Sequence, residues 1–283
     1  MTLRDVGLGP VRLAVADVDR SATWYGRVLG LVPAPEDAGR GATLGVPGGD
    51  ALVRLVPRPG ARPHPGRGRL GLYHFAVLLP DRASLGAFLA HARALGVPLG
   101  AADHGVSEAL YTSDPDGLGI EVYADRPVDA WPRSASGGIE MGTAPLDAGS
   151  LIAAARDRSW SGAPAGTRMG HVHLHVGDLA EAERFYADGL GLQPTLRGYP
   201  GALFLAADGY HHHLGLNTWA GPGATPAGPT EAALLDWEVR LPDDGAVRAA
   251  VDRMRSGGFE PLAEGGDSTF EDPWGTRVAL RVA

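Results

Sequence analysis

Apolar and polar residues alternate in the same order along two distant segments of the chain. Residues 11–31 and 172–192 align without gaps and share Val, Leu, Val, Asp, Tyr, Leu, Gly and Leu at matching places. Each segment opens with an apolar residue at every second position, which is the period of a half-buried strand. Asp17 and Asp178 then stand where a helix would be capped, before a short stretch with an aromatic–Tyr pair. Both segments are therefore predicted to form a strand followed by a helix.

A second pair of segments repeats in a similar way. Residues 74–81 (HFAVLLPD) align with residues 236–243 (DWEVRLPD), and a helical stretch follows each of them. Both copies close with a DP turn and a strand, at residues 114–122 and 272–280. The chain therefore contains four similar β-α-β-β-β modules. The modules begin near Pro10, His74, His171 and Asp236.

Two modules precede and two follow a stretch rich in proline and glycine. We expect one domain over residues 1–127 and another over residues 169–283. A linker over residues 128–168 would join them and include a helix at 150–157. The predicted fold class is α+β, with strongly curved, mainly antiparallel sheets.

Composition narrows the chemistry that such a fold could support. The hydrophobic fraction of 44% supplies enough apolar surface for two cores. The chain has no cysteine, so any metal must be held by His, Asp or Glu. A net charge of -8 without a clustered basic face argues against nucleic acid or an acidic membrane as a partner. The first residues contain no apolar run typical of a signal peptide or membrane span, so a cytoplasmic protein is expected.

Five of the ten histidines fall on two predicted strands in the same phase. His171, His173 and His175 alternate with apolar residues, and on the second strand His211 and His213 alternate with His212, Leu214 and Leu216. One face of each strand would then be apolar and the other would carry imidazole rings. Any single ring could simply face solvent, but five together favour the wall of a polar cavity.

Three residues stand out as candidate metal ligands. Glu121 lies on the polar face of the last strand of the second module, so it is expected to point inward. His74 and His171 stand at the starts of modules two and three, whereas modules one and four offer Pro10 and Asp236 there. Two imidazoles and one carboxylate, with further positions open, form the facial triad of non-haem iron(II) oxygenases.

The motifs GHVHLHVGDL, DPDG before GIEVY, and GYHHHLGLNTW resemble the vicinal oxygen chelate (glyoxalase/bleomycin resistance/extradiol dioxygenase) superfamily, and within it the CatE-type catechol 2,3-dioxygenases. The resemblance covers nearly the whole chain, and HHH together with DHGVSEALY is its most specific part. It implies four modules in two glyoxalase/extradiol-dioxygenase-like domains. It also implies iron(II), with manganese(II) as the alternative, held by His74, Glu121 and His171. Because these ligands belong to modules two and three, the two halves of the chain are expected to pair with each other.

The resemblance implies further roles around the metal. His104 and Tyr111 occupy the places of a His and a Tyr that precede the metal-binding Glu in extradiol enzymes, and both are expected to be catalytic. His213 is expected to be the catalytic acid/base, with His212 one position away in register. Trp219 would line the substrate pocket or serve only in packing. The expected substrate-binding residues are His173, His212, Asn217 and Trp219.

The implied function is cleavage of a catechol with O2 to a 2-hydroxymuconic semialdehyde-type product, by an enzyme expected to be a homo-oligomer. A glyoxalase-like lyase or isomerase of the same superfamily would use four protein ligands around nickel or zinc, usually two of them carboxylates. Only Glu121 is apparent here. A non-catalytic small-molecule-binding (resistance) protein would need no metal, and the His, Tyr and Glu constellation argues against it. Taken singly, His74 could be an edge-strand histidine, Glu121 a surface charge and His104 a loop residue.

Overall fold

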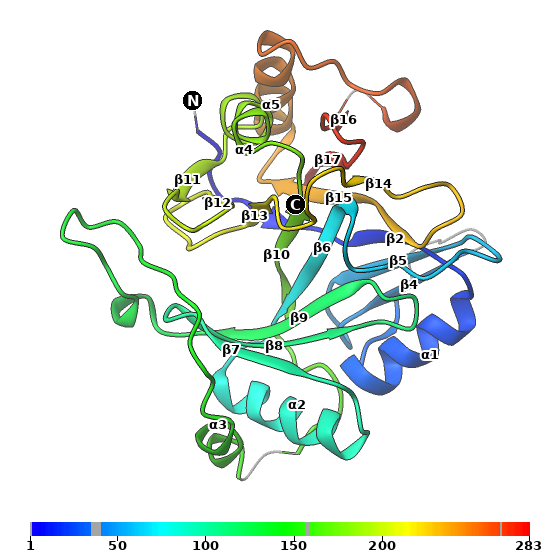
Figure 1. Cartoon of the computed structure of the whole chain (residues 1–283), viewed down its shortest axis with the longest axis vertical. Helices are drawn as coiled ribbons and strands as arrows, with labels where there is room; N and C mark the ends of the chain where they lie inside the picture. The colour runs from blue at the N-terminus through cyan, green and yellow to red at the C-terminus, as the bar shows by residue number, and fades with distance from the viewer. Residues whose placement is uncertain (1, 35–40, 157–158, 267) are drawn as a thin grey trace.

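The computed structural model describes residues 2–34, 41–156, 159–266 and 268–283. Within these ranges the strands form two curved sheets, one of eight strands and one of nine, that lie at an angle to each other (Figure 1). One apolar core extends through both sheets and the helices that cover them. The predicted α+β fold class is confirmed.

The first sheet is built from modules one and four. Its strand order is β16-β17-β15-β2-β5-β4-β3, with β1 paired to β15. The strands are β1 (Gly7–Leu8), β2 (Val11–Val15), β3 (Val32–Pro33), β4 (Ala42–Gly45), β5 (Ala51–Pro57), β15 (Ala233–Leu241), β16 (Thr269–Glu271) and β17 (Arg277–Val282).

The second sheet is built from modules two and three, in the order β11-β12-β13-β10-β6-β9-β8-β7, with β14 paired to β6. At its centre β6 and β10 run antiparallel, and His74 lies opposite His173. The expected pairing between the two halves of the chain is therefore present. The strands are β6 (Arg69–Leu78), β7 (Gly100–Asp103), β8 (Ser107–Ser113), β9 (Gly119–Asp125), β10 (Arg168–His175), β11 (Gln193–Leu196), β12 (Ala202–Ala206), β13 (Leu214–Asn217) and β14 (Thr225–Pro226).

Each module helix starts directly after an aspartate whose side chain accepts a hydrogen bond from a backbone N–H of the first turn. The predicted caps Asp17 and Asp178 are among these four. None of the described helices combines the length and apolar character needed to cross a bilayer. The module helices are α1 (Val18–Leu29), α2 (Arg82–Ala94), α4 (Leu179–Glu183), which continues as a π-helix (η2, Arg184–Gly189), and α5 (Asp244–Ser256).

The linker between the halves carries a short helix packed against α2 (Figure 1). It is α3 (Ala148–Ala154), where the sequence predicted a helix at 150–157. Residue 157 lies outside the described residues. Two further short turns are 3-10 helices, η1 (Val128–Ala130) and η3 (Ala263–Gly265).

The tyrosine shared by the two repeats joins two modules of the same half of the chain. Tyr25 Oη donates to Asp114 Oδ2 at 3.1 Å, and Tyr186 Oη donates to Asp272 Oδ2 at 2.9 Å. All four residues are buried, and both aspartates belong to the DP turns that close modules two and four. Since a buried carboxylate needs hydrogen-bond donors, each tyrosine fixes the turn before a closing strand. Because β9 follows the turn at Asp114, this hydrogen bond also helps to fix the position of Glu121.

Two boundaries differ from the sequence prediction. Strand β6 begins at Arg69, five positions before His74, because Arg69 already pairs with Thr225 of β14. Strand β13 begins only at Leu214. His211 and His213 therefore precede the strand, and the predicted alternation of imidazole and apolar faces is wrong for this run.

Candidate metal centre and its cavity

Neighbouring strands of the second sheet bring His74, Glu121 and His171 together. They lie on β6, β9 and β10, and all three are buried. His74 Nε2 and His171 Nε2 lie 3.0 Å and 3.1 Å from Glu121 Oε2. The two Nε2 atoms are 3.4 Å apart. Burial argues against the alternatives of an edge-strand histidine and a surface carboxylate.

The three atoms are spaced like ligands of one ion. Adjacent ligands at ~2.1 Å from a metal are ~3.0 Å apart at octahedral angles and ~3.4 Å apart at tetrahedral angles. The measured separations span this range, from 3.0 to 3.4 Å. A divalent cation would offset the charge of Glu121 and draw on the lone pairs of both rings. Within the described residues, no other group of three or more His, Asp or Glu side chains has the spacing of metal ligands.

The environment also sets the protonation states that a metal requires. Burial alone would raise the pKa of Glu121, but the charge and hydrogen bonds of His171 and His74 outweigh it and hold this pKa well below its usual range. Burial lowers the pKa of His171, against the opposing effect of Glu121. At neutral pH Glu121 is therefore a carboxylate, and burial favours the neutral form of the His171 ring; these are the forms that bind a metal.

Tyr111 and His104 form a hydrogen-bonded pair beside the three candidate ligands. Tyr111 lies opposite Glu121 across β8 and β9. His104 Nδ1 donates to the Gly142 carbonyl at 2.7 Å, so in the neutral ring Nε2 is left to accept from Tyr111 Oη at 2.6 Å. Burial and the charge of Glu121 raise the pKa of Tyr111 well above its ordinary value. The hydroxyl thus stays protonated and acts as a donor. His104 does lie in a loop, where it is half-buried, but its hydrogen bond with Tyr111 places it at the site.

All three histidines of β10 are buried, but among the described residues only His171 and His173 line the cavity. His173 lines the cavity, whereas Asn217 is fully buried next to it in the sheet. The Asn217 carbonyl accepts from His175 Nδ1 at 2.6 Å, so its amide N–H donates to His173 Nε2 at 2.9 Å. Asn217 is not among the described residues that line the cavity. Its hydrogen bonds are those of a residue that orients His173.

His212 and His213 occupy different surroundings. His212 lines the cavity, and its ring centre is 4.2 Å from that of His171. His213 is not among the described cavity residues, and its Nδ1 accepts from the backbone N–H of Ala207 at 3.2 Å. The structure therefore brings His212, and not His213, to the candidate ligands. The reason is that this run lies in the turn before β13, where successive side chains do not alternate between two faces as they would in a strand.

The environment of His213 leads to a prediction about stability. Burial lowers the pKa of His213 from 6.5 to about 4. The unfolded chain therefore binds this proton below about pH 6.5 while the folded chain does not, so stability falls as the pH drops from 6.5 towards 4. At pH ~5 the loss from this group amounts to about 2 kcal/mol. His213→Gln, which does not titrate, should reduce the difference between unfolding free energies at pH ~7.5 and ~5 by about that amount in urea denaturation. An unchanged difference would contradict the assignment.

The cavity above the candidate ligands has a volume of about 270 Å³. This is near the lower end of small-molecule pockets, ~300 Å³, and suits a molecule of one ring. Trp219, predicted either to bind substrate or to pack, lines the mouth and is 41% exposed. The sequence did not predict the other lining residues beyond the named site: Tyr73, Ala102, Val106, Ser107, Met141, Gly142, Thr143, Tyr199 and Phe204.

The linker forms one wall of this cavity. Asp103 pairs with Ala144 as an isolated bridge beside β7, and Thr143 Oγ1 lies 2.9 Å from Tyr199 Oη. Nothing in the Pro- and Gly-rich composition of the linker indicated this role. The linker reaches the cavity because its backbone pairs with Asp103, and such a pairing leaves no recognisable pattern in a single sequence.

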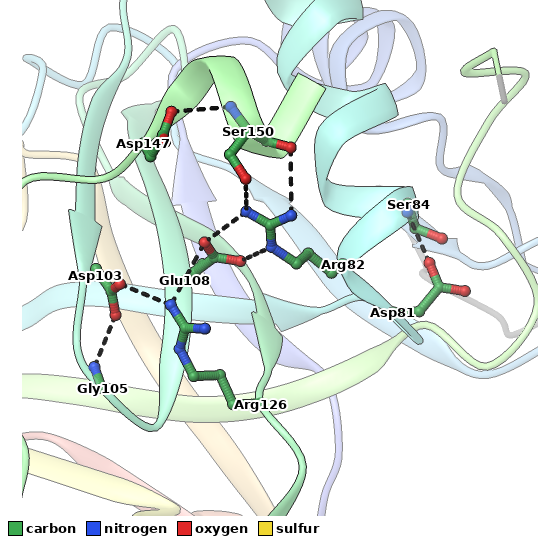
Figure 2. A network of polar contacts seen from close by, with 9 residues as sticks. All are labelled: Asp81, Arg82, Ser84, Asp103, Gly105, Glu108, Arg126, Asp147 and Ser150. Atoms are coloured by element: carbon green, nitrogen blue, oxygen red, sulfur yellow. Dashed lines mark hydrogen bonds and ion pairs between the residues drawn. The ribbon is translucent and has the colours of Figure 1, made fainter. Parts of the chain in front are cut away.

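An ion-pair network holds the linker in this position. Figure 2 shows Arg82 between Glu108 of β8 and Ser150 of α3, and Arg126 between Glu108 and Asp103. Arg82 Nη2 lies 3.0 Å from Glu108 Oε1, and Glu108 is 4% exposed. A buried carboxylate flanked by two guanidinium groups is well compensated. The network thereby ties α3 to the strands that carry Tyr111 and Glu121.

The corresponding face of the first sheet carries ion pairs instead of ligands. Asp236 pairs with Arg12, and Glu238 pairs with Arg54. Pro10 and Ala279 occupy the remaining ligand places of modules one and four. The first sheet is therefore expected to serve as scaffold.

Asp236→Ala tests this expectation. Since Asp236 is engaged by Arg12 and belongs to the other sheet, the variant should retain the metal content of the unaltered protein, measured by elemental analysis after anaerobic purification. A halved content would reveal a second site.

Known proteins resemble this chain in sequence and in fold. The model of the glyoxalase/bleomycin resistance protein/dioxygenase superfamily matches residues 7–122 and 168–280. A catechol-2,3-dioxygenase of Bacillus subtilis (strain 168) is 43% identical over 258 residues, which is 90% of this chain and 90% of the relative. A Bacillus subtilis crystal structure provisionally described as that of a dioxygenase superposes with a TM-score of 0.62 at 15% identity, covering 98% of this chain and 86% of the other. Glyoxalase I of Zea mays superposes with a TM-score of 0.54 at 18% identity, covering 98% and 92%. At these identities the two structures show the shared fold alone.

Proposed function

The chain belongs to the glyoxalase/bleomycin resistance protein/dioxygenase superfamily, and on this premise we propose that it is an extradiol dioxygenase that cleaves a catechol with O2. The observation that carries the proposal is the buried group of His74, Glu121 and His171 at the cavity that also contains Tyr111 and His212. The catechol-2,3-dioxygenase relative at 43% identity supports the same activity. The expected product is a 2-hydroxymuconic semialdehyde-type compound.

The proposed cofactor is iron(II), with manganese(II) as the alternative. His74, His171 and Glu121 would hold it, and the donor set of two imidazoles and one carboxylate fits such an ion. When bound, this ion supplies a Lewis-acidic and redox-active centre with positions open to both catechol oxygens and to dioxygen.

The protein's own groups would bind the catechol and move its protons. Tyr73, Phe204 and Trp219 supply aromatic surface for the ring. The Tyr111 hydroxyl stays protonated, and it can turn its hydrogen from His104 Nε2 to a catechol oxygen, which favours the deprotonated form of that oxygen. The His212 ring can accept the proton that the substrate loses and return it later in the reaction. Burial of the site keeps water from competing for these contacts.

Several broader properties remain part of the proposal. Domain boundaries at residues 1–127 and 169–283, a cytoplasmic location and a homo-oligomeric state are retained from the sequence as expectations. The proposed partners are a catechol-type molecule and O2, without nucleic acid or membrane.

The glyoxalase-type alternative is less well supported by the site. Such an enzyme would need a second carboxylate among its ligands, and the metal-spaced group within the described residues contains only Glu121. Tyr111, His104 and His212 would also have no evident use in a binding protein without catalysis.

The test is aerobic turnover by protein purified without oxygen. Elemental analysis should find iron, and addition of 4-methylcatechol or catechol should give a yellow ring-cleavage product as O2 is consumed. Nickel or zinc as the resident metal together with an absence of product would refute the proposal and favour the glyoxalase class.

A further inference from the structure

We propose that Asp125 and His211 are positioning residues that hold His212 in one tautomer, with its Nε2 free of a proton and available to a molecule in the cavity. The inference rests on the proposed function for its catalytic meaning. It gives a role to His211, the first residue of the His211–His213 run. Among the described residues, His211 belongs neither to the cavity lining nor to the candidate ligands.

Three residues form an unbroken hydrogen-bonded chain from β9 to the cavity. Asp125 Oδ1 lies 2.8 Å from His211 Nε2. His211 Nδ1 lies 2.8 Å from His212 Nδ1. Both imidazoles are buried, at 0% and 8% exposure, whereas the Asp125 side chain retains 22% of its exposure. The chain thus connects a partly exposed carboxylate with a ring that lines the active cavity.

The direction of each hydrogen bond follows from the acceptor at the end of the chain. A carboxylate only accepts, so His211 Nε2 must carry a hydrogen and donate it to Asp125. In the neutral His211 ring Nδ1 is then bare, and it accepts from His212 Nδ1–H. The second nitrogen of neutral His212, Nε2, is consequently left without a proton. This is the form that a general base requires.

Asp125 is itself fixed by two tyrosines. Tyr210 Oη donates to Asp125 Oδ2 at 2.9 Å, and Tyr123 Oη lies 2.8 Å from Tyr210 Oη. Because the Tyr210 hydrogen is used on Asp125, Tyr123 is the donor of the second bond. The rings of Tyr210 and Trp131 pack against His211. The carboxylate and the first imidazole are therefore held in place before any substrate enters.

The arrangement also stabilises the proton that His212 would take up. When a catechol O–H bond breaks, the proton forms an N–H bond at His212 Nε2, and the ring becomes imidazolium. Its Nδ1–H still donates to His211, which still donates to the Asp125 carboxylate. The new positive charge is thus polarised towards a negative group through two hydrogen bonds. No electron transfer is involved in this step.

The tautomer can be measured without any assay of activity. Full-length protein loaded with zinc, as a diamagnetic ion, and labelled with ¹⁵N-histidine should show a His212 ring that is protonated at Nδ1 and bare at Nε2. The signals are assigned by their loss in His212→Gln. A His212 ring protonated at Nε2 in the unaltered protein would overturn the inference, whether or not the protein cleaves catechol.

Asp125→Asn tests the same chain through function. The amide can donate to His211, which permits the opposite tautomer in both rings while nearly preserving shape. We expect kcat to fall about ten- to a hundredfold with little change in KM or metal content, and the His212 signals to shift towards the Nε2–H form. Asp129→Asn, the same charge change at an exposed site nearby, should leave all these quantities unchanged. Normal kcat in Asp125→Asn, or loss of its metal, would refute a positioning role. If the unaltered protein cleaves no catechol, the proposed function fails, and the tautomer measurement still decides the inference.

Discussion

Glu121→Gln is expected to yield a folded protein that neither retains metal nor cleaves a catechol. The amide matches the carboxylate in size but carries no charge, and a neutral amide is a poor ligand beside two neutral imidazoles. Glu121 is 3% exposed and contacts both His74 and His171, so water has little room to replace it. Since a bound metal contributes several kcal/mol of transition-state stabilisation, turnover should fall by at least ~10³-fold.

Metal-dependent stability separates loss of the ion from loss of the fold. Adding iron(II) or manganese(II) under anaerobic conditions should raise the melting temperature of the unaltered protein, because a ligand that binds the folded state stabilises it. The metal-free melting temperature of Glu121→Gln should stay close to that of the metal-free unaltered protein, but the increase on adding metal should vanish. Asp236→Ala serves as the matched control and should keep the full increase. Retention of metal by Glu121→Gln would show that the candidate ligands are misassigned.

The repeats in the sequence were sufficient to predict the module count, and together with the family resemblance they indicated the three side chains that the structure brings together. Strand alternation placed Glu121 and His171 on inward faces, and their positions in modules two and three implied pairing between β6 and β10. This worked because sheet faces have a fixed period of two, so the phase of a single strand determines which side chains share a cavity.

The rest of the site depends on contacts that have no such period. The His211–His213 run lies in a turn, where the direction of a side chain follows from local backbone geometry and not from alternation. The linker wall at Met141 depends on the isolated pairing of Asp103 with Ala144. Asn217 has the phase of a cavity residue, but its side chain bonds to His173 and His175 and is not among the described residues that line the cavity.

His212→Phe should separate proton transfer from metal binding, and it decides between the two adjacent histidines. Phenylalanine keeps a ring of comparable size against His171 and Phe204 but can neither accept nor donate a proton. Metal content should therefore stay near that of the unaltered protein, while turnover falls on the order of a hundredfold or more, the usual scale for a positioned acid/base. The measurement pairs elemental analysis with the rate of yellow product formation from 4-methylcatechol.

His213→Phe is the matched control, because it makes the same change one residue away from the cavity. Its Nδ1 bonds only to the Ala207 backbone among the described contacts, so turnover should remain within a few-fold of the unaltered enzyme. A large loss of turnover in His213→Phe with normal rates in His212→Phe would restore the assignment expected from sequence. If His212→Phe instead loses its metal as completely as Glu121→Gln, His212 is a fourth ligand. The open positions at the metal would then be fewer, and a glyoxalase-type reaction would describe the site better than ring cleavage.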